Sequence, residues 1–351
     1  MSEARTSVGR RGVRRLRPDA HTLFLLVLVL VIFIVMSFAM PTQFPTAANL
    51  ESMAFQMPEL GILTMAMMLA MLTGGIDLSI TATANLSAIT GGIVMASLIK
   101  PDLSVAGDMM VSLVGLLAAA AVGAICGAVN GLLIGRVGVS AILTTLSTMT
   151  LYTGLAYGIT QGHAVHGVPR SILFVGIGKF LGTPTPMIIF VVVLMVISTM
   201  LNHTAYGFKV YMLGSSATAA RFSGINNATV ILKTYIATGL LSTITGLVTL
   251  GRTNSANADY GSSYVLMAIL VAVLGGVAVS GGSGRVSGVV LALLTLQMLS
   301  TGFNMLLFRF SGSNFFRDFA WGLLLLLVMV LTQLIRRGKT WKVWKQVLSP
   351  R

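Results

Sequence analysis

One aspartate is the foremost candidate for chemistry inside the long apolar runs of this sequence. It lies in LTGGIDLSI, residues 72–80, where Gly74 and Gly75 permit a sharp turn and Asp77 precedes a second run. A carboxylate at membrane depth is costly unless it has a partner. We expect Asp77 to accept hydrogen bonds from the first N–H groups of the following helix. Contact with a partner subunit, or a conformational gate, is the alternative.

The sequence lacks residues that serine proteolysis, ATP hydrolysis by a phosphate loop and metal catalysis would each require. The stretch GGSG, residues 281–284, resembles the serine motif of intramembrane proteases, but no histidine follows Ser283 to act as its base. No G-x-x-x-x-G-K-[ST] loop occurs, so the chain itself should not hydrolyse ATP. No HExxH, EF-hand or Cys/His cluster occurs, and the single cysteine, Cys126, lies in an apolar run. The sequence therefore predicts a protein that is not an enzyme and holds no cofactor of its own.

Buried charge is scarce, which bears on how transport could be driven. Of the nine acidic residues, only Glu59 and Asp77 are expected within or at the end of a helix bundle. Carriers driven by ion gradients usually hold ionisable groups well inside their helices. We expect Pro58 and Glu59 in the first turn of a helix near the outer interface, where proline and an acid are locally favourable. An ion-driven carrier or channel acting alone is therefore only the alternative function.

The elements that must position these residues are transmembrane helices. Hydrophobic residues make up 55% of the 351 residues and charged residues 9%, which is too little polar surface for a soluble globule. Runs able to cross about 30 Å of hydrocarbon predict ten helices, and the fold class is an all-α polytopic membrane helix bundle. The predicted spans are roughly 21–40, 53–73, 80–99, 109–135, 140–159, 187–202, 230–250, 263–280, 286–307 and 318–335.

The distribution of basic residues supports this topology with both termini in the cytoplasm. The net charge of +14 is not spread over folded polar domains of the kind that bind nucleic acid, so no nucleic-acid partner is expected. With ten spans, 17 of the 23 Lys and Arg residues fall on the cytoplasmic side. Most of them lie in the two tails, residues 1–20 and 336–351, which flank the transmembrane domain, residues 21–335. The even number of spans follows from this bias.

Each tail has a second interpretation. The N-terminal RRGVRRLR, followed by an apolar run and SFA, also resembles a cleavable secretory signal. The C-terminal tail carries Trp341 and Trp344 among lysines, a pattern that suits contact with anionic membrane lipid, and a disordered tail is the alternative.

Several stretches, in order and spacing, resemble permeases of ABC importers of the ribose, xylose, galactose and autoinducer-2 type. Besides TGGIDLS they are GAICGAVNGLLIG at 123–135, TAYGFKVYMLGSSATAARFSGIN at 204–226, AVLGGVAVSGGSGRVSG at 272–288 and STGFNML at 300–306. The resemblance extends from about residue 50 to 335. The chain departs from the family pattern at Ser140, Thr153, Val265 and Met267. These departures leave the substrate class and the subunit pairing open.

The resemblance implies the membrane half of an importer in a bacterial inner membrane. Two such permeases would form the pathway for a sugar or sugar-like polyol, and the second could be a copy of this chain or a different one. Separate ATPase subunits would bind ATP, and a periplasmic sugar-binding protein would deliver the sugar.

The loop at 202–229 resembles the family's coupling helix, which docks on the ATPase. It is cytoplasmic by charge and long for a helix connection. Small side chains would allow close contact, and Arg221 would offer a salt bridge; a plain surface helix is the alternative. The residues expected to make the contact are Ala219, Ala220, Arg221 and Gly224.

Two further sets of residues are predicted to serve transport. Outer basic residues could steer and register a binding protein by complementary charge, or be merely solvated. These are Arg170, Lys179, Arg252, Arg309 and Arg317. The pathway is expected where helices carry unusual polar density, at Asn85, Thr90 and Asn130, although buried polar side chains also hold helices together.

Overall fold

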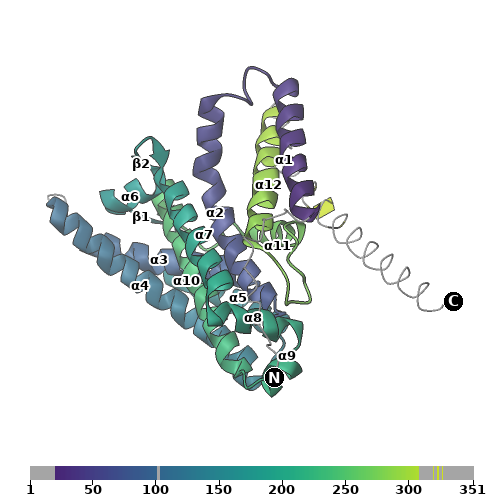
Figure 1. Cartoon of the computed structure of the whole chain (residues 1–351). Coiled ribbons are helices and arrows are strands. Elements are labelled where there is room, and N and C mark those ends of the chain that lie inside the picture. Colours follow the sequence, from purple (N-terminus) through teal and green to yellow (C-terminus); the bar gives the residue numbers. More distant parts are fainter. Residues whose placement is uncertain (1–19, 101–102, 308–318, 320–321, 324–325, 327–351) are drawn as a thin grey trace, which may run out of the picture.

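The computed structural model is a bundle of long helices joined by short connections (Figure 1). The structure describes residues 20–100 and 103–307, together with 319, 322, 323 and 326. The two tails, the predicted tenth span at 318–335, and the predicted docking residues Arg309 and Arg317 lie outside the described residues or almost entirely so.

The first part of the chain forms mostly long helices. Their bounds are α1 (Ala20–Ala39), α2 (Ala47–Leu72), α3 (Ile80–Leu98), α4 (Val105–Leu132) with a π-helical turn (Leu133–Val137), and α5 (Ala141–Thr160). The short α6 (Arg170–Ile177) follows, and α7 (Thr185–His203) is again long.

The second part contains three short helices, α8, α9 and α11, and two long ones, α10 and α12. Their bounds are α8 (Ala205–Ser215), α9 (Ala217–Phe222), α10 (Asn227–Thr253), α11 (Tyr264–Leu274) and α12 (Val286–Leu306). Two short antiparallel pairs connect helices, one of β1 (Val165–His166) with β4 (Ser255–Ala256) and one of β2 (Lys179–Phe180) with β3 (Thr183–Pro184).

Each of the nine predicted spans within the described residues overlaps a helix. By length and composition, seven of the described helical segments could cross a membrane, which makes this a multi-pass membrane protein. The helix α5 has 20 residues but is not among the seven. The helix α11 has 11 residues, a rise of about 16 Å, and covers about half of the hydrocarbon thickness. The count of ten therefore stays a prediction.

The helix α2 begins earlier than expected. Thr46 caps it by accepting a hydrogen bond from the N–H of Asn49 at 3.2 Å, so the polar AANLES stretch is already helical. Pro58 and Glu59 therefore lie in the interior of α2, and their placement in a first turn was wrong. A proline inside a membrane helix is tolerated where neighbouring groups satisfy the freed backbone.

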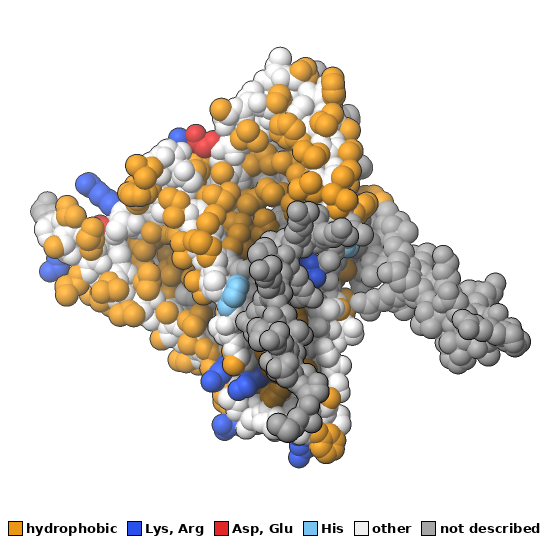
Figure 2. Space-filling view, viewed as in Figure 1, with side chains coloured by type: hydrophobic (Ala, Val, Ile, Leu, Met, Phe, Trp, Pro, Cys, Tyr) orange, Lys and Arg blue, Asp and Glu red, His pale blue; other side chains and the backbone are white. Residues whose placement is uncertain are grey.

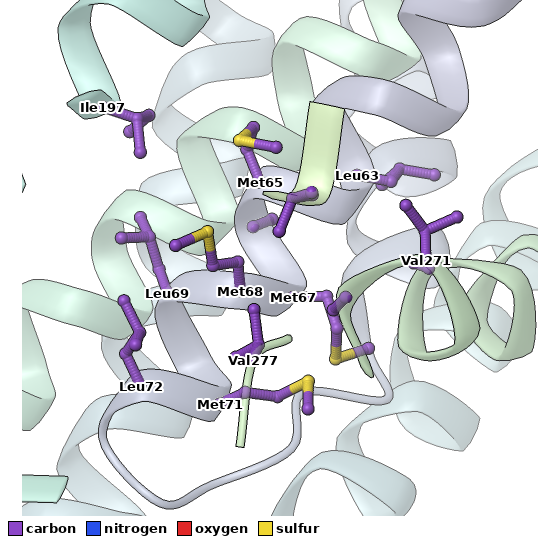
Figure 3. Close-up of a cluster of buried hydrophobic side chains, with 14 of the residues drawn as sticks. Leu63, Met65, Met67, Met68, Leu69, Met71, Leu72, Ile197, Val271 and Val277 are labelled. Atoms are coloured by element: carbon purple, nitrogen blue, oxygen red, sulfur yellow. The ribbon is translucent and has the colours of Figure 1, made fainter. Parts of the chain in front are cut away.

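The core forms around the second half of α2, every residue of which is buried from Gly61 to Leu72. Its methionines, among them Met65 and Met68, pack with Ile197 of α7 and Val271 of α11 (Figure 3). A second apolar cluster joins α3, α4 and α5 to α10. Because methionine is unbranched and adaptable, it fills the irregular gaps between crossing helices.

The outer surface is largely apolar, as a lipid-facing surface should be. Figure 2 shows hydrophobic side chains over most of one face, with Lys and Arg gathered at its lower end and upper left edge. Large exposed apolar residues are frequent on α1, α4 and α7, for example Phe24, Leu117 and Val196. This distribution agrees with a bundle embedded in lipid.

Candidate functional site

The break between α2 and α3 places Asp77 in the protein interior, where it is 3% exposed. Gly74 has φ +87°, which turns the chain after the end of α2. The Oδ1 atom of Asp77 accepts hydrogen bonds from the backbone N–H and the hydroxyl of Ser79, at 3.0 and 2.7 Å. The Oδ2 atom accepts one from the hydroxyl of Thr238 in α10, at 2.8 Å. Asp77 thus binds Ser79, the residue just before α3, rather than the first turn of that helix.

Side chains from two other helices complete this arrangement. Asn130 of α4 donates to the Ser79 hydroxyl at 2.8 Å and so extends the chain of bonds that ends on Asp77. Tyr235 of α10 is fully buried, and a Cβ on Gly75 would lie 2.6 Å from its hydroxyl oxygen. A side chain at position 75 would therefore have to displace the buried Tyr235 hydroxyl, a close contact that the sequence pattern alone did not reveal.

A second broken helix meets the first. After α11 the chain turns through Gly276, with φ +87°, and reaches Gly282, whose N–H donates to the carbonyl of Leu72 at 3.0 Å. Gly214, near the end of α8, packs on the same carbonyl, which a Cβ there would approach to 1.9 Å. We call the meeting point of residues 72–79, 275–285 and 214–215 the inner junction.

The predicted coupling loop contains α8 and α9. The Ser216 hydroxyl caps α9 by accepting from the N–H of Ala219 at 3.2 Å, and Gly224, with φ +77°, follows the helix end. Ala219 and Arg221 are exposed, whereas Ala220 is completely buried and has no surface to offer a partner in this conformation. Sequence reasoning missed Phe222, which is 90% exposed. The signal was the one aromatic residue within SSATAARFSGI, residues 215–225, next to Arg221.

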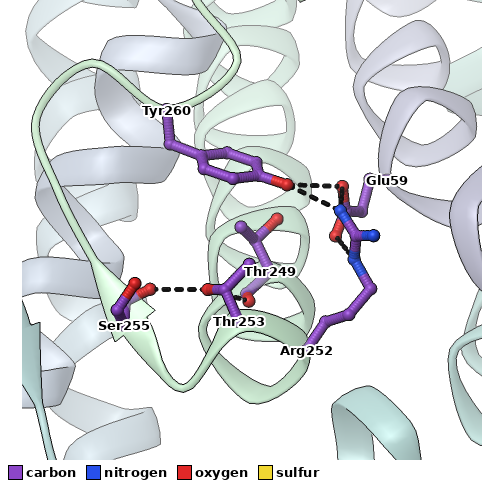
Figure 4. A network of polar contacts seen from close by, with 6 residues as sticks. All are labelled: Glu59, Thr249, Arg252, Thr253, Ser255 and Tyr260. Atoms are coloured by element: carbon purple, nitrogen blue, oxygen red, sulfur yellow. Dashed lines mark hydrogen bonds and ion pairs between the residues drawn. The ribbon is translucent and has the colours of Figure 1, made fainter.

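At the opposite end of the bundle, Glu59 and Arg252 form a buried ion pair (Figure 4). The Nε and Nη2 atoms of Arg252 donate to the two carboxylate oxygens of Glu59 at 2.6 and 2.8 Å, a bidentate geometry. Nη2 also donates to the Tyr260 hydroxyl at 2.6 Å. Burial raises the pKa of Tyr260, so its hydroxyl stays protonated at neutral pH. The guanidinium predicted to dock a binding protein is therefore held by a carboxylate from α2.

The other two described outer cations differ in their surroundings. Lys179 forms an ion pair with Glu51 at 2.5 Å, and both side chains are almost half exposed. Arg170 is exposed at the start of α6, and Asp108 of α4 accepts hydrogen bonds from its backbone N–H and that of Ser171, at 3.0 and 2.9 Å. Asp108 thereby fixes α6 to α4 and leaves the guanidinium of Arg170 at the surface.

The three predicted pathway residues make hydrogen bonds within the protein. The Asn85 amide of α3 donates to the carbonyls of Ala258 and Tyr260, at 2.8 and 3.0 Å, and so anchors the loop before α11. Thr90 donates to the Leu86 carbonyl in its own helix. Asn130 belongs to the inner junction's hydrogen bonds. These contacts fit the alternative of holding helices together, and a role in the pathway stays a prediction.

A polar cavity lies beside the Glu59–Arg252 pair, and sequence reasoning missed it. It has a volume of about 190 Å³ and lies between α2, α10, α11 and α12. Its polar lining includes Gln56, Arg252, Gln297, Ser300 and Asn304. We call it the α2–α12 cavity. The signal available in the sequence was the spacing of Gln297, Ser300 and Asn304, which repeats once per helical turn.

Apolar helices that break at glycine-rich turns inside a lipid-facing bundle, with polar groups gathered at the breaks, are typical of the class of membrane transport proteins. A protein-family model described as "Branched-chain amino acid transport system / permease component" matches residues 49–333, and the chain belongs to that family.

Curated relatives narrow the similarity further. The chain is 35% identical over 285 residues to the ribose import permease protein RbsC of Escherichia coli, covering 80% of this chain and 85% of that protein. It is 32% identical to RbsC of Bacillus subtilis, covering 86% and 89% of the two chains. It is 28% identical to the L-arabinose transport system permease protein AraH of Escherichia coli, covering 90% and 91%. No solved structure matches. The predictions of a permease subunit and of a protein that is not an enzyme are confirmed.

Proposed function

We propose that this chain is the membrane subunit of an ATP-driven importer for a sugar or sugar-like polyol in a bacterial inner membrane. The observation that carries the proposal is the similarity, over most of the chain, to import permeases for ribose and L-arabinose. ATP would be bound by a separate ATPase subunit, and a periplasmic binding protein would supply the sugar.

A branched-chain amino acid is the second candidate substrate, because the family description names that class. Such a ligand would need an apolar pocket for its side chain and paired charges for its amino and carboxylate groups. The α2–α12 cavity has apolar lining at Leu60, Met267 and Leu296, but the charged group among its lining residues, the Arg252 guanidinium, is already neutralised by Glu59. This lining favours a neutral polyol.

The exposed end of α9 supports docking of the ATPase. Aromatic and arginine side chains dominate the energetics of many interfaces, and Arg221 and Phe222 both point out of the bundle at this short, capped helix. A ligand shifts a conformational equilibrium only through different affinities for the two states, so ATP must act through a mechanical connection. The direct connection is α8, because Gly214 packs on Leu72 where α2 breaks.

The helix α5 supports a second permease subunit. An open groove of about 440 Å³ on α5 is lined by Ser147, Thr150, Gly154 and Gly158 together with Leu151, Leu155 and Ile159. Neither glycine has an atom within 4 Å of its Cβ direction. Small residues let helix backbones approach closely in membranes. The helix has 20 residues but is not among the helices long and apolar enough to span a membrane, and a second permease subunit packed on this groove would cover its polar and its apolar side chains.

The proposal is tested by purifying the tagged chain from its native membrane in mild detergent and identifying co-purifying proteins. We expect an ATPase subunit that the Arg221→Glu variant no longer retains. In membrane vesicles, uptake of radiolabelled ribose or L-arabinose should require ATP and survive dissipation of the ion gradients. Recovery of the chain alone, with uptake that collapses together with the ion gradient, would instead establish the carrier. Uptake of leucine but of no sugar would favour the second substrate.

A further inference from the structure

The α2–α12 cavity is lined by a polar stripe that the helix bundle does not need for its own packing. Gln297, Ser300 and Asn304 recur at one helical face of α12, and Gln56 contributes an amide from α2. Gln297 is buried and Ser300 partly buried, whereas Gln56 and Asn304 are exposed. A buried polar side chain inside a membrane bundle is expensive and usually serves either helix association or function.

Association between the described helices does not account for these side chains. The amide of Gln297 donates to Thr301 of the same helix, at 3.4 Å, and that of Gln56 donates to Ser52 of the same helix, at 3.0 Å. Among the described residues, neither side chain forms a hydrogen bond between helices, and the same holds for the side chains of Ser300 and Asn304. Their polar atoms are therefore available to a molecule in the cavity.

The α10 side of the cavity presents the guanidinium of Arg252, which is held in a fixed position. Glu59 and Tyr260 hold Arg252 through Nε and Nη2, and within the described part of the chain Nη1 donates to no other residue. Glu59 is 1% exposed, whereas the Arg252 side chain is 26% exposed and lines the cavity. The pair is neutral overall, so it offers oriented donors without attracting a charged ligand.

We propose that the α2–α12 cavity binds one small neutral polyol within the single permease chain, on the outer side of the bundle. The amides and the serine hydroxyl would exchange hydrogen bonds with its hydroxyl groups, and Arg252 would donate to one of them. The volume is more than ten times the roughly 10–15 Å³ that one water needs. The outer location follows from the topology given by the basic residues, and the inference rests on the proposed function as a sugar importer.

Cysteine labelling tests the site directly, because the single native cysteine, Cys126, is buried. Cells that carry the whole importer with a Ser300→Cys variant are treated with a membrane-impermeant methanethiosulfonate reagent. We expect labelling from outside that saturating ribose or L-arabinose slows about fivefold or more. A Gln43→Cys variant, in the exposed connection between α1 and α2, should label at the same rate with and without sugar. Asn304→Cys serves if the Ser300→Cys protein does not accumulate.

A second variant measures the contribution of one amide. In the Ser300→Cys background, Gln297→Leu should raise the sugar concentration that gives half protection by about fivefold to tenfold, the value of roughly one lost hydrogen bond. Gln43→Leu, a matched change outside the cavity, should leave that concentration unchanged.

The outcomes separate the cavity from the importer. If ATP drives sugar uptake but labelling is absent at both cavity positions, or is unaffected by sugar, the cavity assignment is overturned and the importer stands. If the unmodified protein takes up no sugar in an ATP-dependent way, the proposed function itself fails. Protection by sugar that Gln297→Leu does not weaken would also overturn the assigned lining.

Discussion

The inner junction and the α2–α12 cavity both place polar groups at membrane depth, but they use them differently. At the inner junction the Asp77 carboxylate has three donors, and glycines bring backbone into contact with backbone. In the cavity, amide and hydroxyl groups face open volume, and among the residues that the structure describes they bond at most within their own helices. A saturated, tightly packed polar site fixes structure, whereas an unsaturated one is prepared for a ligand.

The largest expected effect comes from the ion pair that borders the cavity. Arg252→Met leaves the Glu59 carboxylate buried without its partner, and we expect a loss of about 3–5 kcal/mol in stability. Thermal unfolding of the purified chain in detergent measures it. The double variant Glu59→Gln with Arg252→Met removes the buried charge and should recover most of the loss. An unchanged unfolding temperature in the single variant would show that the pair contributes nothing to the fold.

Gly214→Ala should come next, because its Cβ would lie 1.9 Å from the Leu72 carbonyl oxygen. The backbone cannot yield as a flexible side chain would, so we expect a loss of about 3 kcal/mol. Gly158→Ala, at a helix position with open space around it, is the matched control and should not lower stability. Equal unfolding temperatures for the two variants would contradict the close packing of the inner junction.

Asp77→Asn should have a smaller effect on stability. The amide keeps one acceptor but directs its NH₂ group at a donor, either Ser79 or Thr238, at a cost of about 1–3 kcal/mol. If the role of Asp77 is structural, ATP-driven uptake per folded molecule should be unchanged. Loss of uptake in a protein that folds and still retains its ATPase would instead indicate a conformational gate.

Phe222→Ala should change stability least, by less than about 0.5 kcal/mol, because the side chain is 90% exposed. Its effect should appear in retention of the ATPase during co-purification, which we expect to fall about tenfold or more if Phe222 is a central contact. Leu181→Ala, at the tip between β2 and β3 and 91% exposed, is the control and should retain the ATPase fully. Equal retention by both variants would remove Phe222 from the interface.

The position of most helices was predictable, because apolar runs and their polar breaks are local features. The prediction for α3 differs from the structure by a single residue, at Leu98. The errors occurred where the boundary of an apolar run is not the boundary of the helix. At α2, the Thr46 cap starts the helix inside a polar stretch, and at α11 the glycine turn ends the helix after Leu274 although the sequence stays apolar.

Site residues were predictable only where one short motif contained them. The turn at Gly74 and the cap at Ser216 follow from residue types and neighbours. The partner of Glu59 could not be predicted in this way, because Arg252 lies 193 residues away in the sequence. Likewise, nothing local distinguishes Ala220, which is buried, from Ala219, which is exposed.

By itself, the sequence determined that this is an apolar helix bundle of the permease class, since hydropathy, glycine breaks and family motifs are written along the chain. Only the tertiary structure decided which polar groups pair and which remain available. Hydrogen bonds and ion pairs act over about 3 Å, so their energies depend on which helices cross at that range. Helix crossings bring Thr238 to Asp77 and Arg252 to Glu59, and they leave Gln297 facing open volume.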